Sequence, residues 1–219
     1  MTDQPDPTNA PGTGAEDAET PDADAHWADR KRKQQAARQR MLAKKTREKG
    51  LLMVHTGKGK GKTTAAMGLV MRALGHGQRV GIVQFVKGKW ETGERPILDK
   101  FADQVTIRVM GEGFSWDSQD RQRDIAAARA AWDAAKDMIA DPDYDLIILD
   151  ELNIVLRYEH LPIDEVVATL SARRPDLHVL VTGRNARDAL IEAADMVTEM
   201  TMVKHHFRAD VKAQAGIEF

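Results

Sequence analysis

Thr56-Gly57-Lys58-Gly59-Lys60-Gly61-Lys62-Thr63 is the stretch of this 219-residue chain that decides its fold. The apolar residues 51–55 come before it, and the helix-forming residues 63–74 come after it. Glycines let the backbone turn sharply and direct successive N–H groups to one point, where the start of a helix adds partial positive charge. A strand, a glycine-rich loop and a helix in this order predict a phosphate-binding loop, or P-loop.

The residues of this loop have separate expected tasks. Lys62 is placed to reach the outer phosphates of a nucleotide, and the Thr63 hydroxyl is placed to bind Mg²⁺. The general pattern, G-x-x-x-x-G-K-[ST], has glycine where this chain has Thr56, so the match fails at one position. A glycine-rich turn that binds nothing is the alternative. The predicted nucleotide-binding residues are Gly57, Lys58, Gly59, Lys60, Gly61, Lys62, Thr63 and Thr64.

A second motif supports the first. The apolar strand predicted at residues 144–149 ends in two carboxylates, Asp150 and Glu151. In P-loop folds this strand lies beside the phosphate loop, where its acidic end binds Mg²⁺ directly or through water. Acidic residues at a strand end can also be turn formers. With the P-loop present, the sequence favours a metal site made of Thr63, Asp150 and Glu151.

The rest of the chain alternates between strand-like and helix-like segments. Strands are expected at residues 51–55, 79–86, 105–110, 144–149, 177–182 and 196–203, and helices at 63–74, 118–140, 163–173 and 186–193. This alternation is typical of a parallel sheet with crossover helices. The predicted fold class is therefore α/β: a P-loop (RecA-like), doubly wound, mostly parallel sheet with helices on both faces.

The N-terminal part has a different composition from the rest. Residues 1–29 are rich in acidic residues, Pro, Thr and Ala, and we expect a disordered acidic tail. Residues 30–49 are strongly basic and contain good helix formers, which predicts a helix. That helix could be a solvated charged helix, an active-site lid or anion-binding arm, or a nucleic-acid contact. Residues 50–219 form the predicted P-loop domain.

Composition excludes several classes of protein. The net charge is −2, with 30% charged residues and no cysteine, so disulfides, thiolate metal sites and cysteine nucleophiles are excluded. No apolar run is long enough to cross a membrane, and the acidic N-terminus lacks the apolar core of a signal peptide. We expect a cytoplasmic protein without a membrane or nucleic-acid partner.

The two motifs indicate a nucleotide but leave the reaction open. No Asn-Lys-x-Asp pattern for guanine is present, so ATP is favoured over GTP. Kinases and ATPases share this fold, so a phosphoryl-transfer enzyme is one alternative. A non-hydrolytic ATP sensor or nucleic-acid-binding module is another, in which residues 30–49 would contact phosphates.

A series of short motifs narrows the choice by resemblance. Together they resemble the cob(I)yrinic acid a,c-diamide adenosyltransferases, the P-loop type of ATP:corrinoid adenosyltransferase. The resemblance runs from about residue 30 to the C-terminus, and the Thr-first phosphate loop is itself characteristic of that family. The motifs are TGKGKGKTTAAMG (56–68), GHG (75–77), VQFVKG (83–88), GER (93–95), GFSW (113–116), LDEL (149–152), TGR (182–184), VKH (203–205) and VKAQAGI (211–217).

The resemblance implies a reaction. Members of this family transfer the 5′-deoxyadenosyl group of ATP to the cobalt of a reduced corrinoid, and intact triphosphate leaves. Cobalt(I) is the nucleophile, so no activated serine or cysteine is needed, and none is apparent. The enzyme must stabilise a highly charged leaving group, which lysines, backbone N–H groups and Mg²⁺ or Mn²⁺ can do. The triphosphate is expected to lie reversed in the loop, because C5′ must face the cobalt.

The resemblance also implies residues and partners. Lys62 and Thr63 carry over as catalytic residues of the loop, and Phe114 and Trp116 as the aromatic pair that displaces the lower axial ligand of cobalt(II). Trp90 is a weaker aromatic candidate. The basic segment 30–49 is expected to cover the active site. His205 and His206 are interpreted as surface or packing histidines rather than cobalt ligands. A reduced flavin or flavoprotein donor, a homodimer and a role in adenosylcobalamin biosynthesis are likewise implied.

Overall fold

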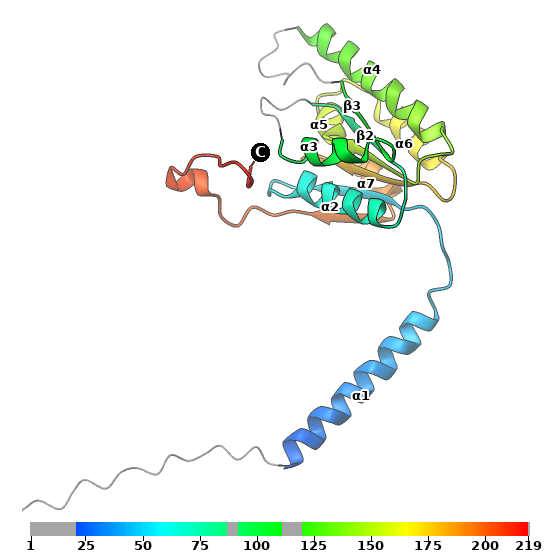
Figure 1. Ribbon diagram of the computed structural model, residues 1–219, viewed down its shortest axis with the longest axis vertical. Helices are drawn as coiled ribbons and strands as arrows, with labels where there is room; N and C mark the ends of the chain where they lie inside the picture. Colours follow the sequence, from blue (N-terminus) through cyan, green and yellow to red (C-terminus); the bar gives the residue numbers. More distant parts are fainter. Residues whose placement is uncertain (1–20, 87–91, 111–119, 219) are drawn as a thin grey trace, which may run out of the picture. The chain divides into compact units, whose positions relative to one another are not determined.

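The computed structural model describes residues 21–86, 92–110 and 120–218 (Figure 1). The chain divides into two compact units, Met1–Arg47 and Glu48–Phe219. The second unit begins two residues before the start of the predicted P-loop domain, at residue 50. None of the helices in the described part of the chain is long and apolar enough to span a membrane.

The first unit contains one helix, α1 (Pro21–Ala43). It begins nine residues before the basic segment, so residues 21–29 are helical rather than part of a disordered tail, and residues 44–49 are not helical. Proline at the first helical position and acidic residues in the first turn both favour a helix start there. From residue 23 onward its side chains are almost all exposed, as expected of a helix that is polar all round. Its function as a lid stays a prediction.

The second unit is built on six parallel strands. They are β1 (Leu52–Thr56), β2 (Val80–Gln84), β3 (Val105–Val109), β4 (Leu146–Asp150), β5 (His178–Thr182) and β6 (Met196–Glu199). Their order across the sheet is β3-β2-β4-β5-β1-β6, and every neighbouring pair is parallel. The carboxyl ends of all six strands therefore meet at one edge, where α/β proteins bind their ligands.

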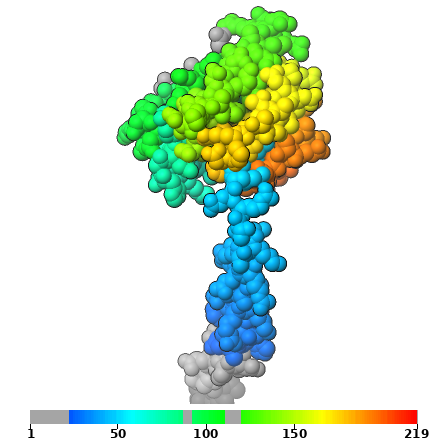
Figure 2. Space-filling model, turned by 90° about the vertical axis from the view of Figure 1, so that its right-hand side faces the viewer, coloured from blue at the N-terminus to red at the C-terminus, as the bar shows by residue number. Residues whose placement is uncertain are grey.

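Helices cover both faces of this sheet. One face packs against α2 (Lys62–Gly75) and the short α3 (Arg95–Leu98), in a core that includes Val70, Ile82, Ile148 and Leu180. The other packs against α4 (Arg121–Ala140), α5 (Leu152–Arg157), α6 (Ile163–Ser171) and α7 (Asp188–Ala193). On the surface, the yellow and orange regions around α6 and α7 adjoin (Figure 2). These features confirm the doubly wound α/β fold.

The apolar stripe predicted on α4 is largely confirmed. Ala128, Trp132, Ala135 and Ile139 are buried against the sheet, whereas Ile125 is half-buried. The predicted strands and long helices agree with the structure to within a few residues at their ends. The helices α3 and α5 and the 3₁₀ helices η1 (Asp99–Phe101) and η2 (His206–Ala209) were not expected. Each has only three to six residues, too few to show a periodic apolar pattern.

Candidate functional site

The phosphate loop connects β1 to α2 in a conformation that needs its glycines. Gly57 and Gly61 have φ angles of 94° and 100°, in the left-handed region that side chains disfavour. Gly57 and Gly59 also pack against the chain after β6. A Cβ atom at these positions would lie 2.4 Å and 2.7 Å from the carbonyl oxygen of Met200. The loop is therefore fixed from behind as well as by its own backbone.

Thr56 has a structural task that explains why it replaces the usual glycine. Its side chain is buried, and its hydroxyl accepts a hydrogen bond from the backbone N–H of Ala186 at 3.0 Å. Its carbonyl accepts a second bond from the N–H of Met200 at 2.9 Å. Thr56 thus joins the beginning of the loop to the segments that follow β5 and β6. Glycine could not supply the hydroxyl.

Lys62, the first residue of α2, is 7% exposed and folds back over the loop. Its Nζ donates to the carbonyl oxygens of Gly57 at 3.0 Å and Gly59 at 2.6 Å. Burial lowers the pKa of Lys62; the charge of Glu151 opposes this shift and that of Arg184 adds to it. A charged ammonium held at the centre of a phosphate loop is the arrangement that binds a polyphosphate.

The other predicted loop residues lie at the surface. Lys58, Lys60, Gly61 and Thr64 are exposed, and Thr63 is half-buried. Gly61 precedes α2 and offers no side chain to cap it, so the N-terminal N–H groups of that helix face outwards for a ligand. Lys60 is paired with the carboxylate of Glu218, close to the C-terminus. The structure therefore brings together the loop and a residue that the sequence analysis did not single out.

Asp150, the last residue of β4, forms hydrogen bonds to residues of α2, β5 and β2. Its Oδ1 accepts hydrogen bonds from the hydroxyls of Thr63, at 3.0 Å, and Thr182, at 2.7 Å. Asp150 is 4% exposed, and this burial raises its pKa. Hydrogen bonds from the side chains of Thr182, Thr63 and Gln84 lower the pKa and oppose part of this shift. Strand β5 separates β4 from β1, so the carboxylate reaches the loop across an intervening strand. Thr182 is the residue of that strand that makes the connection.

Glu151 follows Asp150 and holds an unusual backbone conformation, with φ of 62°. Its N–H donates to the hydroxyl of Thr182 at 3.0 Å, and its Oε2 is buried without a hydrogen-bond partner in the described residues. Burial raises the pKa of Glu151 to about 7, and Asp150 contributes, while Lys62 and Arg184 oppose the shift. An orphaned carboxylate oxygen next to a second carboxylate fits a divalent cation with oxygen ligands.

A cavity of about 260 Å³ opens beside these groups. Its wall combines polar residues at the ends of strands and helices with an apolar floor from the face of the sheet that packs against α2 and α3. The lining residues are Thr63, Thr64, Met67, Ile82, Gln84, Val86, Thr92, Glu94, Arg95, Leu98, Ile107, Asp150, Glu151 and Glu218. The predicted metal ligands Thr63, Asp150 and Glu151 thus share one cavity.

Several residues of this site carried no predicted function. Gln84 and Thr182 end their strands at the ligand edge of the sheet, so strand-end position is a signal that could have found them. Glu94 and Arg95 lie at the start of α3 and had appeared only as part of a sequence motif. Glu218 has no local signal, because its place beside the loop results from a long-range chain reversal.

Some predicted residues fall elsewhere. Phe114, Trp116 and Trp90 lie outside the described residues. His205 and His206 are half-buried in the C-terminal segment, where their rings stack with centroids 4.6 Å apart. The Nδ1 atom of His205 accepts a hydrogen bond from the N–H of Phe207 at 3.2 Å. Their interpretation as packing histidines is compatible with these contacts.

Comparison with known proteins identifies similar sequences over most of the chain. Residues 48–219 match the family model described as ATP:corrinoid adenosyltransferase BtuR/CobO/CobP. A corrinoid adenosyltransferase of Pseudomonas aeruginosa is 51% identical over 92% of this chain and 99% of its own length. A corrinoid adenosyltransferase of a Sinorhizobium species is 49% identical over 90% of this chain and 92% of its own length. A corrinoid adenosyltransferase of Escherichia coli K12 is 48% identical over 78% of this chain and 87% of its own length.

Proposed function

The chain belongs to the ATP:corrinoid adenosyltransferase family, and we propose that it transfers the 5′-deoxyadenosyl group of ATP to the cobalt of a reduced corrinoid. Triphosphate is the leaving group of this reaction. The product places the enzyme in adenosylcobalamin biosynthesis.

One observation carries the proposal. The hydroxyl of Thr63, at the start of α2, and the hydroxyl of Thr182, at the end of β5, meet on one oxygen of Asp150. Lys62, the neighbour of Thr63, lies buried over the glycine-rich loop. Phosphate donors and cation ligands therefore adjoin, as a triphosphate with its divalent cation requires.

The protein's contribution to this reaction is electrostatic. The cobalt(I) electron pair forms the cobalt–carbon bond at C5′, and the C5′–O bond breaks with its electron pair going to the triphosphate oxygen. Cobalt is thereby oxidised by two electrons, formally to cobalt(III), so no protein nucleophile is consumed. Lys62, the loop N–H groups and the N-terminus of α2 stabilise the charge that develops on the departing triphosphate.

A divalent cation, Mg²⁺ or Mn²⁺, fits this site. Thr63, Asp150 and Glu151 would hold it, and the buried Oε2 of Glu151, which lacks a hydrogen-bond partner within the described residues, supports that assignment. When bound, the cation would neutralise part of the negative charge of the triphosphate. The side chains of Thr182 and Gln84 orient Asp150 for this purpose.

The family resemblance adds further proposals. The triphosphate lies reversed in the loop, so that C5′ rather than the γ-phosphorus faces the second substrate. Phe114 and Trp116 contact the corrinoid and displace its lower axial ligand. A reduced flavin or flavoprotein supplies the electron to cobalt(II), and the enzyme acts as a homodimer.

Product analysis tests the proposed function directly. The full chain is incubated without oxygen with ATP, Mg²⁺ and a chemically reduced corrinoid, and the products are separated in the dark. We expect a light-sensitive cobalt–carbon product and an equal amount of triphosphate. A matched reaction without corrinoid should release neither. Formation of ADP in place of triphosphate would instead identify a phosphoryl-transfer enzyme and refute the proposal.

A further inference from the structure

The segment after β6 returns to the phosphate loop. In Figure 1 the red C-terminal segment leaves β6, turns through η2 and runs back towards the start of α2. At its beginning, the carbonyl oxygen of Met200 accepts a hydrogen bond from the N–H of Gly59 at 2.6 Å. That N–H belongs to the loop whose donors are expected to bind phosphate. One donor of the loop is therefore occupied by the protein's own chain.

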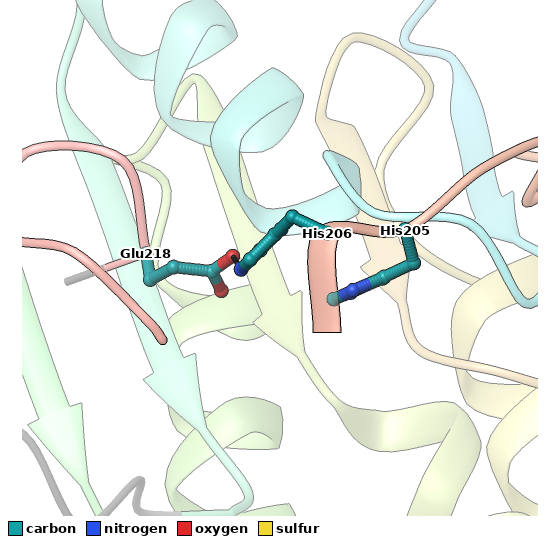
Figure 3. Close-up of side chains that lie close together, drawn as sticks. All are labelled: His205, His206 and Glu218. Atoms are coloured by element: carbon teal, nitrogen blue, oxygen red, sulfur yellow. Dashed lines mark ion pairs between the residues drawn. The ribbon is translucent and has the colours of Figure 1, made fainter. Parts of the chain in front are cut away.

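Glu218, near the end of the segment, occupies a second loop group. Its carboxylate forms an ion pair with the ammonium of Lys60, and its side chain is only 10% exposed. The other carboxylate oxygen lies 3.2 Å from Nε2 of His206, and Figure 3 shows this carboxylate facing the His206 ring. Glu218 also lines the cavity that holds Thr63 and Asp150.

The surroundings of Glu218 suit an anion better than a metal ion. His205, His206 and Glu218 could offer three ligand atoms within 4.8 Å of one another. However, the ammonium of Lys60 already sits on the carboxylate and would repel a cation there. Loss of solvent lowers the pKa of His205, and four nearby positive groups add to the shift: His206, Lys60, Arg208 and Arg184. The cluster is a basic site in which Glu218 is the resident anion.

We propose that the C-terminal segment, residues 200–218, is an internal ligand of the phosphate loop that a polyphosphate must displace. This inference rests on the proposed function, because it assumes that the loop binds the triphosphate of ATP. A phosphate oxygen at Lys60 would meet the carboxylate of Glu218, and two anions on one ammonium repel each other. Nucleotide binding and release of the segment are therefore coupled. Glu218 weakens nucleotide binding by the free energy of its contact with Lys60, which must be broken first.

Binding of inorganic tripolyphosphate, measured by calorimetry on the full chain, tests the competition. Glu218→Gln keeps the shape of the side chain and removes its charge. We expect roughly threefold to tenfold tighter binding, the range for a partly exposed ion pair. Glu192→Gln, on the exposed surface of α7, is the matched control for net charge and should leave affinity unchanged. Equal affinity of Glu218→Gln and the unaltered chain, or weaker binding by Glu218→Gln, overturns the proposal.

Amide hydrogen exchange of the unaltered chain distinguishes displacement from a purely electrostatic effect. On addition of tripolyphosphate, we expect slower exchange in residues 56–63 and faster exchange in residues 200–218. Slower exchange in both segments would mean that the C-terminal segment closes over the ligand, which contradicts displacement. If the unaltered chain and both variants bind neither tripolyphosphate nor ATP, the proposed function itself fails and this inference falls with it. If they bind but the C-terminal segment does not respond, only this inference fails.

Discussion

The hydroxyl of Thr63 donates a hydrogen bond to Oδ1 of Asp150 at 3.0 Å, although 87 positions separate the two residues. Thr63 lies in the first turn of α2, and Asp150 ends β4. The contact brings the two chemical motifs of the sequence into one site and crosses the intervening strand β5.

Replacement of Lys62 by alanine should abolish adenosyl transfer without unfolding the protein. If Lys62 neutralises the proposed triphosphate leaving group, its loss should lower kcat/KM by on the order of 10²-fold or more. Its ammonium bonds only to loop carbonyls among the contacts described above, so the cores on both faces of the sheet stay intact. Steady-state kinetics and circular dichroism test this. Lys100→Ala, at an exposed lysine outside the loop, is the matched control, and near-normal activity of Lys62→Ala would refute the loop assignment.

Thr182→Val should weaken both stability and metal binding. The substitution preserves shape but removes the donor to Asp150 and the acceptor for the N–H of Glu151. Loss of these buried bonds should cost about 1–3 kcal/mol of unfolding free energy. Urea unfolding and Mg²⁺ titration measure the two effects. Thr169→Val removes a half-buried hydroxyl bond within α6 and should affect stability less and Mg²⁺ affinity not at all.

The raised pKa of Glu151 predicts a specific dependence of stability on pH. In the unfolded chain Glu151 ionises near 4.5, and in the folded chain at about 7. Between these values the folded state holds a proton that the unfolded state has lost, so the contribution of Glu151 to stability falls as the pH rises through this window. Above pH 7 it is constant.

Glu151→Gln should remove this dependence. Urea unfolding with a chelator present should show the variant and the unaltered chain equally stable near pH 4.5. At pH 8 the variant should be more stable by on the order of 1–3 kcal/mol, a range reduced for the partial exposure of the side chain. Glu192→Gln serves as the exposed control. A difference that does not change with pH would show that Glu151 is not the titrating group.

Two glycine substitutions should have opposite effects. Gly57→Ala places a Cβ 2.4 Å from the carbonyl oxygen of Met200, at a residue whose φ is 94°. We expect this substitution to lower the free energy of unfolding by about 1–3 kcal/mol and to abolish tripolyphosphate binding. Gly68 lies in α2 with no atom within 4 Å of an added Cβ, and Gly68→Ala should stabilise the helix by about 0.5–1 kcal/mol. Thermal unfolding compares the two variants.

The aromatic pair Phe114 and Trp116 is tested by the oxidation state of the corrinoid. If these residues displace the lower axial ligand of cobalt(II), replacing both by alanine should reduce turnover most when the corrinoid enters as cobalt(II). With chemically pre-reduced cobalt(I) the loss should be much smaller. Equal losses with both substrates would remove the proposed role.

Local patterns predicted the strands and the loop because these features depend on neighbouring residues. Leu146–Asp150 is buried along its whole length, and its uninterrupted apolar run predicted a strand there. Thr63, Asp150 and Glu151 could be predicted as metal ligands because glycine, lysine and carboxylate occupy fixed positions relative to those strands.

Long-range packing explains what the sequence could not predict. The position of β5 between β4 and β1 decides the function of Thr182, and no local pattern encodes the order of strands. Glu218 meets Lys60 across 158 positions. The hydroxyl of Thr56 appeared as a mismatch to a motif, and its meaning depends on the N–H of Ala186, 130 positions away.

The position of β1 in the sheet has a consequence for the folding of the chain during its synthesis. Both strands that pair with β1, which are β5 and β6, lie more than 120 residues after it in the chain. Contacts over such distances in the chain form late, because the entropy of closing large loops must first be overcome. A ribosome therefore has to release residues up to 200 before the glycine-rich loop gains the support of Met200. Until then the emerging polypeptide presents an apolar strand without neighbours, which is a target for chaperones rather than for ATP.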